Sequence, residues 1–297
     1  MQPHITVCIC TFRRPVLLRR LLDKLFEQET DNQFTYSIVV SDNDSRQSGR
    51  AVVEELIPGA KVSLLYCAEP RQNIALARNK ALEHATGTFI AFIDDDEFPA
   101  ADWLKTMLAA CEKYEASGVL GPVRPHFESP PPAWIIKGGF CERPEPPTGT
   151  IMDWDKSRTG NLLFRRAIVP ENESAFKEQF GTGGEDKDFF MRMTQAGCVF
   201  VWCREAVVYE SVPPVRWTRR YMLQRAMLRG ENVLKHPGSK VQLLVRSFIA
   251  APLYFVVLPI TLLLGQHRFM KFAIKFCDHF GRILSALRIN PVTERSA

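Results

Sequence analysis

The chain has 297 residues, of which 46% are hydrophobic and 24% are charged. This composition excludes a disordered chain and is sufficient for one large hydrophobic core or two smaller ones. The net charge of +5 is unevenly distributed, because residues 1–210 carry 24 Lys and Arg against 30 Asp and Glu, whereas residues 211–297 carry 14 against 3. The candidate partners of the basic C-terminal third are therefore anionic lipid, nucleic acid or a phosphorylated substrate.

The eight cysteines lie within apolar segments and show no paired C-x2-C spacing. This pattern argues against a zinc site and favours a reduced, cytosolic protein. The N-terminus has no cationic region followed by an apolar run of roughly 7 to 15 residues, so no signal peptide is expected.

Short apolar runs alternate with amphipathic segments in the first half of the chain. Strands are predicted at residues 5–11, 36–42, 62–66 and 88–94, and helices at residues 17–25 and 74–85. This alternation is typical of βαβ units, so we predict an α/β fold with a mostly parallel central sheet flanked by helices. Further along, strands are expected at 159–164 and 198–203, and a glycine-rich loop leads into a helix from about Glu185.

Residues 122–149 contain eight prolines and are predicted to form a long irregular segment that serves as a binding loop or lid.

Beyond about residue 216 the pattern changes to a basic helix, an uncharged apolar run at 247–264 and a second helix at 268–288. The apolar run is near the lower limit for a membrane span, and a buried core helix is the alternative. The last helix has an apolar face opposed by cations, so the two segments together favour membrane attachment, as a monotopic hairpin or as a short span.

Two predicted strands end in an aspartate, Asp42 and Asp94. In open α/β sheets, ligands bind outside the carboxyl ends of the strands, so both side chains are expected on one functional edge. Four acids follow one another from Asp94 to Glu97. Alternate side chains of an extended segment face the same way, so Asp94 and Asp96 are predicted to converge on Mn²⁺ or Mg²⁺. The alternative is an acidic turn that caps the helix expected near residue 101.

Other polar residues are expected on the same edge. Asp42 is placed to accept hydrogen bonds from a nucleoside base or ribose, with Asp44 two residues further along, and a turn-forming role for both is the alternative. Arg71 and Arg78 bracket the start of a predicted helix, where cations and backbone N–H groups together favour a phosphate. Asp95 is expected to contact the ribose or the sugar.

Five segments in this order resemble a family 2 glycosyltransferase with the GT-A fold: VCICTFRRPVLLRRLLDKL, IVVSDNDS, ARNKALEHATGTFIAFIDDDEFPAADWL, TGNLLFRR and GGEDKDFFMRM. The resemblance covers about residues 4–230. It implies a Rossmann-like catalytic domain over residues 1–230, followed by a basic helical membrane-association region over residues 231–297.

The resemblance also implies residue roles. Thr11, Arg13 and Asp42 would hold the nucleoside, Asp94 and Asp96 would form the metal-binding DxD motif, and Gly160 and Asn161 would line the sugar and acceptor site. Asp186 would be the catalytic base, with Glu185 as the alternative base or an acceptor contact. Many relatives carry a histidine after the last strand that can approach the metal. This chain has Glu210 there, which leaves the rest of the metal shell open.

The expected activity is inverting, metal-dependent transfer of a sugar from a nucleotide-sugar donor, a UDP-sugar above all, to a lipid-linked or cell-surface polysaccharide. Anionic membrane lipid is the other expected partner, nucleic acid is not expected, and the location implied is the cytoplasmic face of the inner membrane. The alternatives are a membrane-bound interaction protein with a degenerate site and a nucleotidyltransferase of similar fold. The second of these would need a glycine-rich loop after the first strand, where the chain reads CTFRRP.

Overall fold

The computed structural model describes residues 2–181, 183–233 and 240–289. The chain divides into two compact units. The first contains residues 1–125 and 143–211, and the second contains residues 126–142 and 212–297. This division falls before the functional boundary predicted at residue 230, and it assigns part of the proline-rich segment to the second unit.

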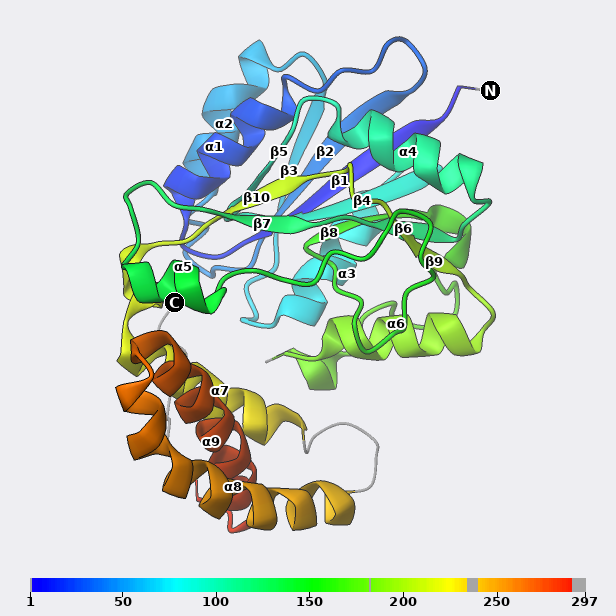
Figure 1. Ribbon diagram of the computed structural model, residues 1–297. Coiled ribbons are helices and arrows are strands. Elements are labelled where there is room, and N and C mark those ends of the chain that lie inside the picture. Colours follow the sequence, from blue (N-terminus) through cyan, green and yellow to red (C-terminus); the bar gives the residue numbers. More distant parts are fainter. Residues whose placement is uncertain (1, 182, 234–239, 290–297) are drawn as a thin grey trace. The chain divides into compact units, whose positions relative to one another are not determined.

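A seven-stranded sheet forms the centre of the first unit (Figure 1). Its strands lie in the order β3-β2-β1-β4-β8-β6-β9, and every neighbouring pair is parallel except the two that contain β8. The strands are β1 (His4–Thr11), β2 (Thr35–Asp42), β3 (Ser63–Ala68), β4 (Phe89–Asp94), β6 (Gly118–Leu120), β8 (Asn161–Arg165) and β9 (Phe200–Trp202). The prediction of an α/β fold with a mostly parallel sheet is therefore confirmed.

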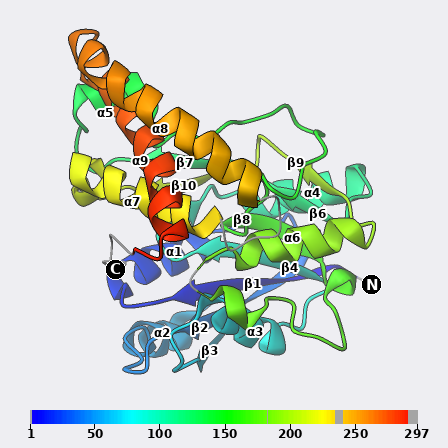
Figure 2. The same cartoon turned by 90° about the horizontal axis from the view of Figure 1, so that it is seen from below.

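Helices cover both faces of this sheet (Figures 1 and 2). One face carries α1 (Pro15–Leu25), α2 (Arg50–Leu56) and α4 (Trp103–Lys113), and the other carries α3 (Ile74–His84) and α6 (Glu185–Gln195). Side chains of successive strand residues point to opposite faces. In β1, Ile5, Val7 and Ile9 accordingly belong to one hydrophobic cluster, whereas Cys8 belongs to the other.

A smaller sheet continues from the acidic segment, with its strands in the order β5-β10-β7. The strands are β5 (Glu97–Pro99), β7 (Val123–His126) and β10 (Val208–Ser211). Since β4 ends at Asp94 and β5 begins at Glu97, the consecutive acids form the turn between the two sheets. Four short 3-10 helices complete the description: η1 (Ile57–Gly59), η2 (Arg166–Ile168), η3 (Glu178–Phe180) and η4 (Pro214–Trp217).

The second unit contains α5 (Ala133–Gly138), α7 (Arg219–Val233), α8 (Lys240–Leu263) and α9 (Gln266–Ala286), and α9 packs against the other three. The proline-rich segment at 122–149, which was predicted to be irregular, contains strand β7 and the short helix α5.

Helices α7 and α9 cross closely at two glycines. A Cβ on Gly230 would overlap the carbonyl oxygen of Asp278, and one on Gly281 would overlap that of Met227. Arg229 and Asp278 join the same two helices by two hydrogen bonds of 2.9 and 3.0 Å.

Helix α8 buries its small and polar side chains and exposes its large apolar ones. Ser247, Ala251 and Thr261 are buried, whereas Leu253 and Val256 are 62% and 70% exposed. By length and composition, α8 alone among the helices of the described residues is a candidate membrane span, and 11% of its most apolar window is buried. So little burial does not fit the alternative of a core helix.

Candidate active site

The carboxyl ends of β1, β2 and β4 meet at one edge of the large sheet. Thr11 pairs with Asp42 across β1 and β2, and Cys10 pairs with Asp94 across β1 and β4. Helices α1 and α3 begin at this edge because each follows one of its parallel strands. The register therefore places the two strand-ending aspartates on the same edge, as predicted from the sequence.

The acidic turn is held by Arg14, which the sequence analysis did not select. Nη1 of Arg14 lies 2.9 Å from Oδ1 of Asp95 and 3.1 Å from Oδ2 of Asp96. The hydroxyl of Thr11 donates a hydrogen bond of 2.9 Å to the other oxygen of Asp95. Asp95 and Asp96 therefore share one cation, and the convergence of Asp94 and Asp96 on a metal stays a prediction.

Asp94 is the acid of this turn with the most solvent access, since half of its side chain is exposed. Partial removal from water raises the pKa of Asp94 to about 6; Arg78 opposes this rise, and Asp96, Asp95 and Glu210 add to it. Glu210 pairs with Arg143 at 2.9 Å, so it belongs to the electrostatic surroundings of the acidic turn.

Glu97 and Gly160 shape the space around Asp94. Glu97 is buried, and its Oε2 accepts the backbone N–H of Asp94 at 3.2 Å. Burial raises the pKa of Glu97 well above its usual range, and the neighbouring Asp94 adds to the effect. A Cβ on Gly160 would lie 3.1 Å from Oδ2 of Asp94 and 2.9 Å from Oε1 of Glu97. Glycine at this position therefore leaves room beside both carboxyl groups.

Arg78 connects the acidic turn with the first turn of α6. Its guanidinium is buried, forms an ion pair through Nη1 with Glu185, and places Nη2 3.9 Å from Oδ1 of Asp94. The contact of Arg78 with a phosphate stays a prediction, and in the structure Arg78 pairs with two of the other predicted site residues. The segment GGEDKD therefore lies beside the carboxyl edge of the sheet.

The two candidate bases, Glu185 and Asp186, differ in their surroundings. Glu185 is buried against Arg78; burial raises the pKa of Glu185, and the cation opposes that rise. Asp186 is half-buried, and its Oδ1 accepts the backbone N–H of Lys187 at 2.8 Å. Asp186 therefore has better access for an incoming hydroxyl group.

Asp42 organises the loop that follows β2. Its Oδ2 accepts the N–H of Gly49 at 2.7 Å and the hydroxyl of Tyr66 at 3.0 Å, and its Oδ1 accepts the N–H of Asp44 at 3.0 Å. Asp44 in turn lies 3.4 Å from Nε of Arg13, whose side chain is 53% exposed. The predicted nucleoside residues thus come together, with the turn-forming role of Asp42 present as well.

Arg71 and Asn161 are placed differently from the other predicted residues. Arg71 is exposed and lies 3.2 Å from Glu178. Asn161 is buried; its amide donates to the carbonyl oxygens of Pro122 and Ala206, and its oxygen accepts from Trp103 Nε1 at 2.9 Å. All the polar atoms of its side chain are used inside the protein, so Asn161 supports the edge of the sheet instead of lining an open site.

Two asparagines that the sequence analysis missed join the loops of this edge. Asn73 caps α3 by accepting the N–H groups of Ala75 and Leu76, and its amide donates to the carbonyl oxygen of Glu178. Asn43 accepts the N–H of Asn73 at 2.9 Å. An asparagine directly before a helical segment is a recognisable capping signal, but its partner at Glu178 is not visible in the sequence.

Among the described residues, no group of three or more His, Cys, Asp or Glu side chains is arranged to hold a metal ion. Mg²⁺ and Mn²⁺ are typically held in such sites by one or two carboxylates, and substrate phosphates complete the shell. The exposed carboxylate of Asp94, with the open space at Gly160, fits a metal of this kind.

A mostly parallel sheet with an acid-lined carboxyl edge and an acidic helix start beside it fits the arrangement expected of a GT-A glycosyltransferase. The sequence model of glycosyl transferase family 2 matches residues 6–169, and the chain belongs to this family.

Curated relatives support the assignment. The chain is 37% identical over 235 residues to the succinoglycan biosynthesis protein ExoM of Rhizobium meliloti (strain 1021), a match that covers 77% of the chain and 74% of that protein. It is 27% identical over 264 residues to the validoxylamine A glucosyltransferase of Streptomyces hygroscopicus subsp. limoneus, which covers 80% of the chain and 57% of that enzyme. The chain is therefore an enzyme, a glycosyltransferase, and its relatives include a polysaccharide biosynthesis protein.

Solved structures show the same fold. The mannosyltransferase PcManGT from Pyrobaculum calidifontis, in complex with GDP-Man and Mn²⁺, aligns with a TM-score of 0.59 at 17% identity over 97% of this chain and 74% of its own. S. aureus TarS 1-349 in complex with UDP-GlcNAc aligns with a TM-score of 0.54 at 19% identity over 75% of this chain and 65% of its own. The GT-A fold predicted from the sequence is thus confirmed.

Proposed function

We propose that the chain transfers a sugar from a UDP-sugar, with inversion and with a divalent metal, to a lipid-linked or cell-surface polysaccharide acceptor. The observation that carries the proposal is the buried Arg78, which contacts both Asp94 and Glu185. The residues assigned to the donor and those assigned to the acceptor therefore lie within reach of one reaction centre. The names of ExoM and of the UDP-GlcNAc complex agree with this donor and this acceptor class.

The proposed residue roles follow from the sequence motifs of the family, and access decides only between Asp186 and the buried Glu185. Thr11, Arg13, Asp42 and Asp44 hold the nucleoside, and Arg78 adds positive charge beside the diphosphate. Asp186 takes the proton of the acceptor hydroxyl as that oxygen attacks, a general-base step that typically contributes 10²- to 10⁴-fold. Attack from the face opposite the leaving group inverts the anomeric carbon, so one base suffices and no covalent intermediate is required.

The proposed metal site consists of Asp94, with Asp96 as a second oxygen donor. When bound there, Mn²⁺ or Mg²⁺ neutralises negative charge on the departing diphosphate. Arg14 holds Asp96 in its present position, and it also limits the repulsion between the adjacent carboxylates.

We further propose that the second unit attaches the enzyme to the cytoplasmic face of the inner membrane, with catalysis in residues 1–230 and membrane association in residues 231–297. The exposed apolar side chains of α8 and the basic charge of this region support attachment to an anionic bilayer.

The decisive experiment is a donor screen with the purified, detergent-solubilised chain. Transfer and hydrolysis are measured for a panel of UDP-, GDP- and dTDP-sugars, with Mn²⁺, with Mg²⁺ and with EDTA. Isothermal titration is expected to show metal-dependent binding of one nucleotide. Equal binding in EDTA would contradict the metal role, and full activity of an Asp186→Ala variant would contradict the assignment of the base.

A further inference from the structure

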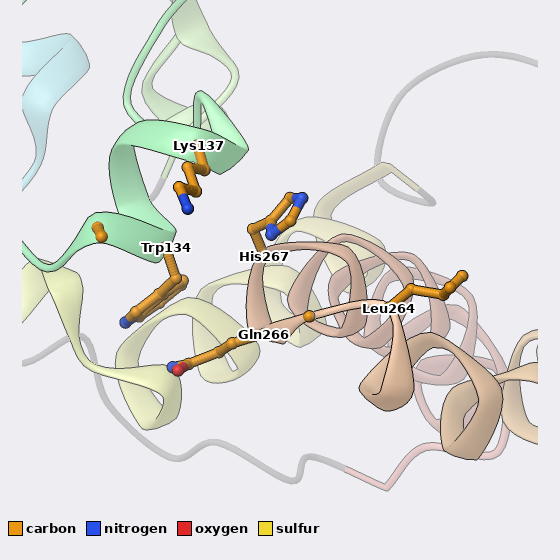
Figure 3. Close-up of a pocket in the computed structure, with 7 residues that line it drawn as sticks. Trp134, Lys137, Leu264, Gln266 and His267 are labelled. Atoms are coloured by element: carbon orange, nitrogen blue, oxygen red, sulfur yellow. The ribbon is translucent and has the colours of Figure 1, made fainter.

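The turn between α8 and α9 lines a cavity of about 540 Å³ together with α5. All of its lining residues belong to the second unit. Trp134 and Lys137 come from α5, Leu264 and His267 from the α8–α9 region (Figure 3). In Figure 3 the Lys137 side chain extends from α5 into the space opposite His267, the Trp134 ring lies on the same side as α5, and Leu264 points away. The volume lies within the roughly 300 to 1,000 Å³ that is usual for a small-molecule site.

The polar side chains of this cavity favour an anion. Lys137 provides a full positive charge, and His267 donates at least one ring N–H in either protonation state. Among the residues that the structure describes, no carboxylate forms an ion pair with either side chain. The first turn of α9 contains no acidic residue. Lysine binds phosphate as a point charge, and hydrogen bonds from charged donors to phosphate are strong.

The cavity lies where the exposed apolar surface of α8 ends. Leu263 and Leu264 are 88% and 54% exposed, and directly after them come Gly265, Gln266 and His267, which line the cavity. If α8 lies in lipid, this change of polarity marks the boundary between the hydrocarbon and the headgroups. Tryptophan and basic residues are enriched at that boundary.

We propose that this cavity binds the phosphate group of a membrane lipid. Lys137 and His267 bind the phosphate oxygens, and the Trp134 ring packs against the adjoining apolar part of the lipid. The site rests on the proposed membrane association of α8, and it adds to that association a defined position for one anionic lipid.

Native mass spectrometry of the full chain in detergent tests the site. The chain is titrated separately with phosphatidylglycerol, phosphatidylcholine and inorganic phosphate. One bound phosphatidylglycerol is expected, with at least tenfold weaker retention in the double variant Lys137→Gln, His267→Gln. The matched control, Lys271→Gln with Lys275→Gln, alters two exposed cations of α9 outside the cavity and should change retention less than threefold.

A second variant keeps the test valid if the first one is unstable. Ala133 lines the cavity and is exposed at the first position of α5, so Ala133→Glu adds a negative charge without removing a contact. It should weaken phosphatidylglycerol retention at least tenfold while the helical circular dichroism and the melting temperature stay unchanged.

Three results would overturn the proposal: unchanged retention in both cavity variants, equal loss in the control variant, or retention of inorganic phosphate as strong as that of phosphatidylglycerol. The last would indicate a site for a soluble anion.

Vesicle flotation separates this proposal from membrane association itself. A wild-type chain that does not float contradicts membrane association, whereas floating chains with unchanged lipid retention contradict the cavity site alone.

Discussion

At the residue scale, Asp186 and Glu185 are neighbours in the sequence but have different surroundings. Asp186 is half-buried and accepts one backbone hydrogen bond, which an asparagine can also accept. We therefore expect Asp186→Asn to lower the transfer rate by 10²-fold or more, because the substitution removes the proposed general base. Nucleotide affinity and melting temperature should not change. Steady-state kinetics with titration calorimetry checks this, and retained turnover would move the base to another residue.

Glu185 is expected to affect stability more directly. It forms the buried ion pair with Arg78, so Glu185→Gln replaces the carboxylate partner of this buried cation with a neutral amide and leaves Asp94, at 3.9 Å, as its ion-pair partner. Removing one partner of such a pair typically costs about 3 kcal/mol or more. Urea unfolding measures the loss. The control is Glu83→Gln, whose exposed pair with Lys80 should contribute less than about 1 kcal/mol. Equal effects of the two substitutions would contradict the structural role of Glu185.

With Asp94 as the proposed metal ligand, we expect nucleotide-sugar binding to depend on pH. Its pKa is raised to about 6, and only the deprotonated carboxylate binds a divalent cation. Lowering the pH from 7 to 5 should therefore weaken Mn²⁺-dependent binding of the donor by about tenfold, in line with the deprotonated fraction of a group with that pKa. Calorimetry at the two pH values tests this, with Asp94→Asn as a control that should bind weakly at both.

The sequence was sufficient to place Asp42, Asp94 and Asp186 because each follows a periodic strand or begins a helix at the functional edge. It was not sufficient to predict the contacts that Arg14 and Asn161 make. The run FRRP contains two adjacent arginines, and only the turn of the chain before α1 decides which one meets Asp95 and Asp96. Asn161 is satisfied by Trp103, Pro122 and Ala206, which lie far from it in the chain.

At the element scale, the longer strands and the helices that cover the sheet were predictable because their apolar residues repeat over five or more positions. Strands β5 and β6 have three residues each, too few for a period to appear, and they form because neighbouring strands pair with them. Pro252 and Pro259 interrupt the apolar run, yet α8 continues through both. Proline weakens a helix locally without preventing it where the rest of the segment is favourable.

The crossing of α7 and α9 depends on glycine. A methyl group at position 281 would meet the backbone of Met227, which cannot rotate away as a side chain can. Gly281→Ala should therefore destabilise the chain by roughly 1 to 3 kcal/mol. Thermal unfolding in detergent checks this. The control is Gly59→Ala, whose added Cβ meets nothing within 4 Å and should be neutral or slightly stabilising. An unchanged Gly281→Ala protein would mean that the helices are further apart.

At the scale of the whole molecule, we expect the proposed membrane attachment to depend on the exposed face of α8. Leu253 and Val256 are largely exposed, so Leu253→Glu with Val256→Glu should leave the fold intact and release the chain from vesicles. We expect at least a tenfold loss in flotation with anionic vesicles. The control, Ile57→Glu, changes an exposed apolar residue of the first unit and should float like the wild type. Flotation of the double variant would place the attachment elsewhere.

We further expect the pair of Arg78 and Glu185 to determine when the active site can form. The two residues are 107 positions apart in the chain. A ribosome adds roughly 5 to 20 residues per second, so the arginine is made on the order of 5 to 20 s before its carboxylate. Until Glu185 is made, the N-terminal part of the sheet would have to bury the Arg78 guanidinium with Asp94, at 3.9 Å, as its carboxylate partner. We therefore expect the segment that contains β1 to β4 not to reach its final packing while the chain is being synthesised. The carboxyl edge of this sheet and helix α6 should become stable together.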